Sequence, residues 1–146
     1  MSNYPHITLP QKCGWFYILT LSFNGTLGFG ITLGLSRRLQ KGYCNPTASR
    51  QVFSHLYYGK YSQIIGLERY IKNQWGDKRL ILFNERLEWF DPVHRITDYA
   101  LVQFLEGRCQ VRYPEIYRVK SDHLPFSPGD HFKDIKERPN HFLERI

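Results

Sequence analysis

The 146-residue sequence has few cysteines, and its three, Cys13, Cys44 and Cys109, are scattered along the chain. An odd number without a Cys-x-x-Cys pair, and without a histidine at finger spacing, indicates neither a disulfide framework nor a zinc site. A reducing cytoplasm is the simplest compartment for such a chain.

Long hydrophobic runs are also missing. The first residues, "MSNYPHITLPQKCG", contain no apolar run after a basic start, and no apolar stretch approaches the ~20 residues of a membrane span. We therefore expect a soluble protein that is not exported and does not associate with a membrane.

Acidic residues are the minority charge, with 13 Asp and Glu against 20 Lys and Arg, for a net charge of +7. This balance favours a polyanionic partner, nucleic acid first and an anionic membrane second. A hydrophobic content of 42%, of which aromatic residues are a large part, excludes a disordered chain. The length suits one domain with a single core.

A β-hairpin is predicted near the N-terminus. Residues 15–23, "WFYILTLSF", are aromatic and β-branched, and they end at Asn24 and Gly25, a strong signal for a two-residue hairpin loop. Residues 26–32, "TLGFGIT", are then the return strand.

A two-residue loop fixes the register of this hairpin, with Tyr17 opposite Thr32 and Leu19 opposite Gly30. Directly opposed residues point to the same side of a sheet. Tyr17 therefore shares its face with Gly28, Gly30 and Thr32.

Two helices are expected next. The first begins near Ser36, carries paired arginines and ends near Gly42. In the second, from Ser62 to Gly76, Ile64, Glu68, Ile71 and Trp75 form one stripe, so we expect Glu68 to lie within an apolar face.

The rest of the chain completes a small α+β (α/β) fold with a mainly antiparallel central sheet flanked by helices. Residues 78–90 predict one or two strands, and residues 91–107 a helix capped by Asp91 with Pro92 first. We expect residues 1–107 to form the domain, and residues 108–146, rich in proline, to be an irregular C-terminal extension packed on it or extending from it.

Three neighbouring predicted elements thus carry a tyrosine hydroxyl, an arginine guanidinium and the Glu68 carboxylate. This set of groups is suited to phosphodiester hydrolysis. A guanidinium pairs with phosphate oxygens, a carboxylate holds Mg²⁺, and a tyrosine can take the proton of an attacking water. Structural interpretations compete with this one: Tyr17 as a core aromatic, Arg37 and Arg38 as a solvated helix face, and Glu68 as the partner of a structural arginine.

The segments "WFYIL", "GFGITLGLSRRL" and "GLERYIK" resemble, in their order and spacing, the motifs of the GIY-YIG nuclease superfamily, in particular its small stand-alone or phage-type members. The resemblance covers about residues 14–90. It implies a DNA endonuclease dependent on Mg²⁺ or Mn²⁺, with Tyr17 as general base, Arg38 on the phosphate and Glu68 as metal ligand.

Gly28 stands where the family has its second tyrosine, so another residue must complete the site or the site is weakened. Candidates to fill the gap are Lys41, Tyr43, His55, Tyr57 and Tyr58, and Asn84 is a candidate for the family's late asparagine. The predicted substrate-binding residues are Gly28, Gly30, Thr32, Arg37, Lys41, Tyr43 and His55, with Arg50 as a further phosphate clamp.

Two alternatives remain open. The chain is then either a catalytically impaired GIY-YIG-fold module that binds DNA, or a regulatory protein whose basic surface is incidental. A nuclease with one such site could nick alone, whereas cutting both strands calls for a homodimer or two sequential events.

Overall fold

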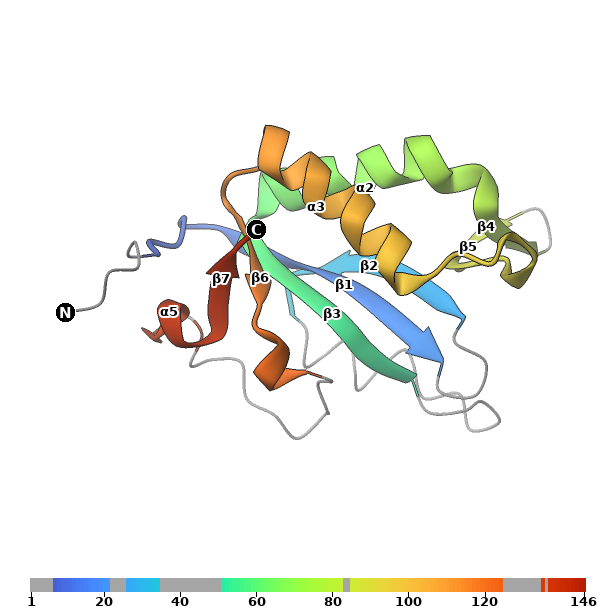
Figure 1. The fold of residues 1–146 in the computed structure, drawn as a ribbon. Coiled ribbons are helices and arrows are strands. Elements are labelled where there is room, and N and C mark those ends of the chain that lie inside the picture. Colours follow the sequence, from blue (N-terminus) through green and yellow to red (C-terminus); the bar gives the residue numbers. More distant parts are fainter. Residues whose placement is uncertain (1–6, 22–25, 35–50, 83–84, 125–134, 136) are drawn as a thin grey trace.

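The computed structural model describes residues 7–21, 26–34, 51–82, 85–124, 135 and 137–146. Within these residues one sheet has the strand order β4-β5-β2-β1-β3-β6-β7, and its neighbouring strands pair antiparallel (Figure 1). The strands are β1 (Cys13–Leu21), β2 (Leu27–Thr32), β3 (Gln51–Lys60), β4 (Arg79–Leu82), β5 (Glu85–Phe90), β6 (Ile116–Val119) and β7 (Leu143–Arg145).

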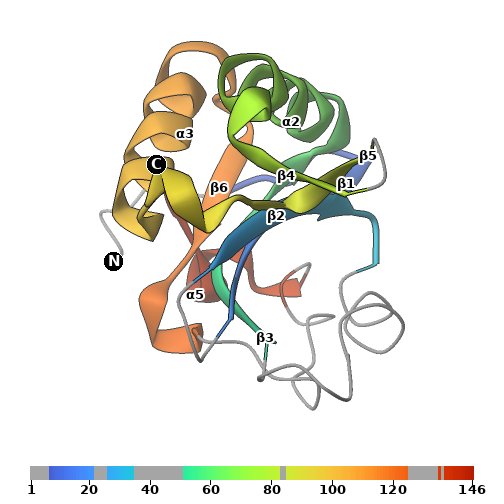
Figure 2. The same ribbon diagram turned by 90° about the vertical axis from the view of Figure 1, so that its right-hand side faces the viewer.

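Two long helices, α2 (Tyr61–Trp75) and α3 (Asp98–Arg112), lie side by side over one face of the sheet (Figures 1 and 2). The short helix α5 (Pro139–Phe142) lies beside β7, away from that pair. Three 3₁₀ turns, Gly76–Lys78, Pro92–His94 and Ser121–His123, complete the described elements. The predicted class, a small α+β fold with an antiparallel sheet flanked by helices, is confirmed.

The sheet separates two apolar cores, because side chains alternate between its faces. On the face covered by α2 and α3, here called the helix face, Phe16 and Ile18 pack with residues of both helices. On the opposite face, here called the Tyr17 face, Trp15, Tyr17 and Leu19 pack with residues from β3, β6 and β7.

The predicted register of the first hairpin is wrong by two residues. Tyr17 is opposite Gly30, and Thr32 is opposite Trp15. The last β1–β2 pair among the described residues joins Thr20 to Leu27, and Asn24 and Gly25 lie outside these residues. A shift of two keeps every side chain on its face, so Tyr17 still shares its face with the motif glycines and Thr32.

Helix α2 begins and ends as predicted, with Gly76 following Trp75, but its buried stripe is Ile64, Leu67 and Ile71. Glu68 lies beside this stripe rather than within it.

The single helix predicted over residues 91–107 is wrong. Asp91 caps only the turn Pro92–His94, accepting a hydrogen bond from the Val93 N–H at 3.0 Å. Arg95 then adopts a left-handed conformation with φ of 50°, which ends that turn. A second cap, Thr97, starts α3 by accepting from the Ala100 N–H at 3.1 Å.

The expected boundary between residues 107 and 108 falls inside α3, which continues to Arg112 and buries Cys109. Beyond it, β6 and β7 extend the same sheet, and neither strand was predicted. Strand β3 was also missed, whereas residues 78–90 form two strands, β4 and β5. The helix expected over residues 36–42 lies outside the described residues.

Candidate functional site

The first motif residues contact each other directly across the β1–β2 ladder. Tyr17 is fully buried, at 0% exposure, and its ring lies against the backbone of Gly30. A Cβ atom at Gly30 would collide with the Tyr17 hydroxyl and come within 2.7 Å of Cζ. A side chain at residue 30 would therefore force the Tyr17 ring to shift.

The other two predicted substrate contacts on β2 differ in exposure. Gly28 is buried and lies between Leu19 of β1 and Trp89 of β5 in the sheet. Thr32 is half-buried at the end of the strand, where its hydroxyl accepts a hydrogen bond from the Gly34 N–H at 3.1 Å.

Glu68 is held on α2 at the border between core and solvent. Its side chain is 20% exposed, and Oε1 lies 3.4 Å from Nζ of Lys72, one turn further along the helix. Tyr61, Ile65, Glu68 and Lys72 stand at i, i+4, i+7 and i+11, so they form one stripe of α2, here called the Glu68 stripe.

The Glu68 stripe faces away from α3. Other positions of α2 make the contacts with α3 and with Tyr113, the residue that follows α3. Tyr70 stacks on Phe104, and a Cβ atom added at Gly66 would lie 2.8 Å from the hydroxyl of Tyr113. At 100° per residue these positions are on the other side of the helix from Glu68.

Glu106 of α3 forms hydrogen bonds with Tyr57 of β3 and Arg118 of β6, so α3 lies over that part of the sheet. The flank of α2 that faces away from α3 therefore lies toward β2 (Figure 2). Tyr17 is on the opposite face of the β1–β2 pair. Glu68 and Tyr17 therefore approach β2 from different sides of the sheet. A site that includes both residues would have to extend around this strand rather than lie on one face.

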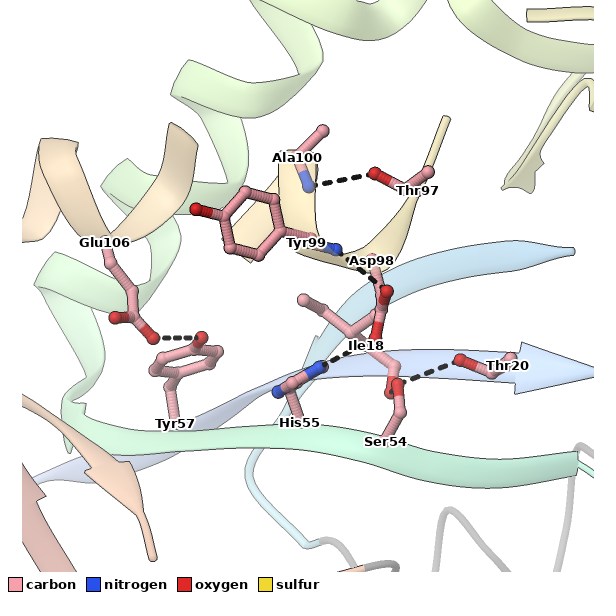
Figure 3. Close-up of polar contacts among 10 residues, drawn as sticks. All are labelled: Ile18, Thr20, Ser54, His55, Tyr57, Thr97, Asp98, Tyr99, Ala100 and Glu106. Carbon is pink, nitrogen blue, oxygen red and sulfur yellow. Dashed lines mark hydrogen bonds and ion pairs between the residues drawn. The ribbon is translucent and has the colours of Figure 1, made fainter. Parts of the chain in front are cut away.

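Two of the candidates to replace the second tyrosine are on the wrong side of the sheet (Figure 3). His55 is opposite Ile18 on the helix face, and its Nε2 lies 3.3 Å from Oδ2 of Asp98. Tyr57 is on the same face and donates a hydrogen bond to Glu106 at 2.7 Å. His55 is thus on the face of the sheet opposite to that of Tyr17, and its predicted contact with substrate stays a prediction.

A third candidate, Tyr58, is on the Tyr17 face but serves as a packing residue. Its ring centroid lies 4.4 Å from that of Trp15, and only 4% of the residue is exposed. Burial raises the pKa of Tyr58 to about 12, so its hydroxyl is a weaker acid than that of an ordinary tyrosine.

A charged network lies on the helix face and was not predicted from the sequence. Arg118 of β6 donates from Nε to Glu144 of β7 at 2.9 Å and from Nη1 to Glu106 of α3, which also accepts from Tyr57. Burial is the main reason that the pKa of Tyr57 is well above its usual value, with the Glu106 charge adding to it. Glu106 directly follows Leu105 of the buried series Leu101, Leu105 and Cys109, so a carboxylate beside an apolar stripe was the available signal.

Among the described residues, no three His, Cys, Asp or Glu side chains gather as a set of metal ligands. Glu68 is thus a single carboxylate. Six predicted residues lie outside the described ranges: Arg37, Arg38, Lys41, Tyr43, Arg50 and Asn84.

In the described part of the chain, no helix has the length and apolar character needed to cross a membrane. Comparison of the sequence and structure with protein-family models, curated proteins and solved structures found no match.

Proposed function

We propose that this chain is a Mg²⁺-dependent endonuclease that hydrolyses DNA phosphodiester bonds, as its motif spacing suggests. The observation that carries the proposal is the mutual fit of Tyr17 and Gly30 on adjacent strands. Glu68, on the flank of α2 toward β2, and the net charge of +7 add support.

Glu68 is the residue that would hold the metal. A Mg²⁺ ion is commonly held by one or two carboxylates together with waters and substrate phosphates, so a single partly exposed carboxylate fits it. Lys72 is bound to the same carboxylate and has to release it. When bound, the metal would polarise the phosphate and stabilise the charge on the leaving oxygen.

The proposed roles of the other residues follow the resemblance. Arg38 binds the scissile phosphate with paired donors, and Tyr17 accepts the proton of the attacking water. Because Tyr17 is fully buried, this second role requires that substrate binding expose its hydroxyl.

Nicking of supercoiled plasmid DNA tests the proposal. The parent protein should convert the plasmid to the relaxed form with Mg²⁺ and not with EDTA, and Glu68→Gln should lose this activity. Glu137→Gln, a change at an exposed acidic residue of the C-terminal segment, is the matched control and should retain it. Equal activity of the two variants would contradict the assignment of Glu68.

A second candidate, a DNA-binding module that does not cut, is favoured by one observation. Gly28 leaves no hydroxyl at the second tyrosine position, and the hydroxyls of Tyr57 and Tyr58 do not replace it, because Tyr57 binds Glu106 on the other face and Tyr58 packs against Trp15. Salt-sensitive retention of DNA in a gel shift, with no nicking by the parent in Mg²⁺ or Mn²⁺, would select this candidate.

A further inference from the structure

A cleft of about 570 Å³ opens at the start of α2. Its walls come from residues 10–12, just before β1, and from Lys60, Tyr61, Ser62 and Ile65 at the junction of β3 and α2. This volume is within the range of ligand-binding clefts.

The cleft is continuous with the Glu68 stripe. Tyr61 and Ile65 line the cleft, and they precede Glu68 by two turns and one turn on the same flank of α2. A group that occupies the cleft and extends along this flank therefore reaches the Glu68 carboxylate.

The cleft also adjoins the end of β2. A Cβ atom at Gly14 would lie 2.9 Å from Cε2 of Tyr61 and 3.4 Å from the carbonyl oxygen of Thr32. The same small space therefore separates the cleft wall from the end of the strand that carries Gly30.

The charges and the ring in the cleft suit a nucleic-acid backbone. Lys12 Nζ lies 5.3 Å from the ring centroid of Tyr61. Lys60 Nζ is 3.9 Å from Glu115, and both of these side chains are more than 40% exposed, so solvent screens their pair and the ammonium stays available. Lysines bind phosphates without regard to sequence, and an aromatic ring offers a surface for a sugar or base.

We propose that this cleft binds the sugar–phosphate backbone of DNA beside the phosphate that is cut, with Lys12 and Lys60 on phosphates and Tyr61 against the adjoining nucleoside. This inference rests on the proposed nuclease function. It assigns affinity and placement of the strand to the cleft, and no sequence preference.

The test is the salt dependence of binding to a fluorescent DNA duplex of mixed sequence, measured by anisotropy in EDTA over a range of KCl concentrations. The variant Lys12→Gln with Lys60→Gln is compared with Arg112→Gln plus Arg145→Gln, which removes equal charge at exposed residues of α3 and β7 outside the cleft. The lysine variant should reduce the slope of log K against log salt by about 2, roughly one per phosphate contact. Thermal unfolding confirms that both variants fold.

Equal slopes for the two double variants would overturn the proposal. Plasmid nicking, measured in parallel, separates it from the nuclease assignment. If nicking requires Glu68 and the lysine variant keeps the slope of the parent, the cleft proposal is wrong and the nuclease proposal stands. If the lysine variant has a reduced slope and the parent does not nick the plasmid, the nuclease proposal is wrong and the cleft stands as a DNA contact.

Discussion

At the scale of single residues, two glycines illustrate how context decides the effect of a side chain. Gly30 lies under the Tyr17 ring, where an added Cβ would be 2.7 Å from Cζ, whereas a Cβ on Gly107 would meet nothing within 4 Å. The first is required by packing between strands, and the second is a helix-interior glycine with open space beside it.

Gly30→Ala should therefore lower the free energy of unfolding by about 1–3 kcal/mol, because the buried tyrosine has to shift. Gly107→Ala should raise it by about 0.5–1 kcal/mol, since alanine favours the helix. Urea denaturation of both variants measures the two changes. A neutral Gly30→Ala would show that Tyr17 and Gly30 are not in contact.

The buried thiol of Cys109 gives a pH prediction. Burial, with help from the nearby Glu106, raises its pKa from 9.0 to about 12. The unfolded chain thus releases this proton at a lower pH than the folded protein, so the free energy of unfolding falls as pH rises from about 9 toward 12.

In Cys109→Ala this contribution is absent. The stability difference between parent and variant should be constant below pH 9 and should shift in favour of the variant above it, in urea titrations at a series of pH values. A difference that stays constant across this range would contradict the shifted pKa.

At the scale of elements, the local signals in the sequence predicted what depends on local chemistry. The aromatic and β-branched composition of residues 15–23 predicted β1, and the apolar stripe followed by Gly76 predicted α2. Strands β3, β6 and β7 were missed because their pairing partners are distant in the chain, as in the Tyr57–Arg118 pair. The predicted hairpin register was wrong by two residues, because it rested on an assumed position of the loop, whereas the register is set by the pairing of the whole strands.

The start of α3 is also determined locally, by the N-cap Thr97, which was not predicted. Thr97→Ala removes the hydroxyl that accepts from the Ala100 N–H and should lower the free energy of unfolding by about 1 kcal/mol. Thr97→Ser keeps the acceptor and should be close to the parent. Thermal unfolding compares them, and equal losses in both variants would show that the cap does not stabilise the helix.

At the scale of the whole molecule, strands β6 and β7 of the C-terminal part belong to the same sheet, and their buried side chains belong to the same two cores. Arg118 links β6 to α3 and β7, and Ile116, Val119 and Leu143 are buried. A fragment of residues 1–107 would cut α3 before Cys109 and remove these side chains from both cores.

Such a fragment should not fold cooperatively, whereas the full chain should unfold in a single transition. Circular dichroism during denaturation distinguishes the two behaviours. A cooperative transition in the fragment would show that residues 108–146 form a separate extension.

The candidate site was only partly predictable. The face shared by Tyr17, Gly28, Gly30 and Thr32 follows from the period of a strand and agrees with the structure. The position of Glu68 beside the apolar stripe, on the other side of β2, depends on how α2 packs against α3, and no local pattern in the sequence encodes that packing.

The measurement that tests the central claim most directly is the initial rate of plasmid nicking in Mg²⁺ by the parent and by Glu68→Gln. The two rates are compared at protein concentrations that bind the same fraction of the DNA. The account predicts a loss of at least about 100-fold in the variant, the scale of removing a group that stabilises transition-state charge, while its DNA affinity stays that of the parent. Equal rates for the two proteins would contradict it.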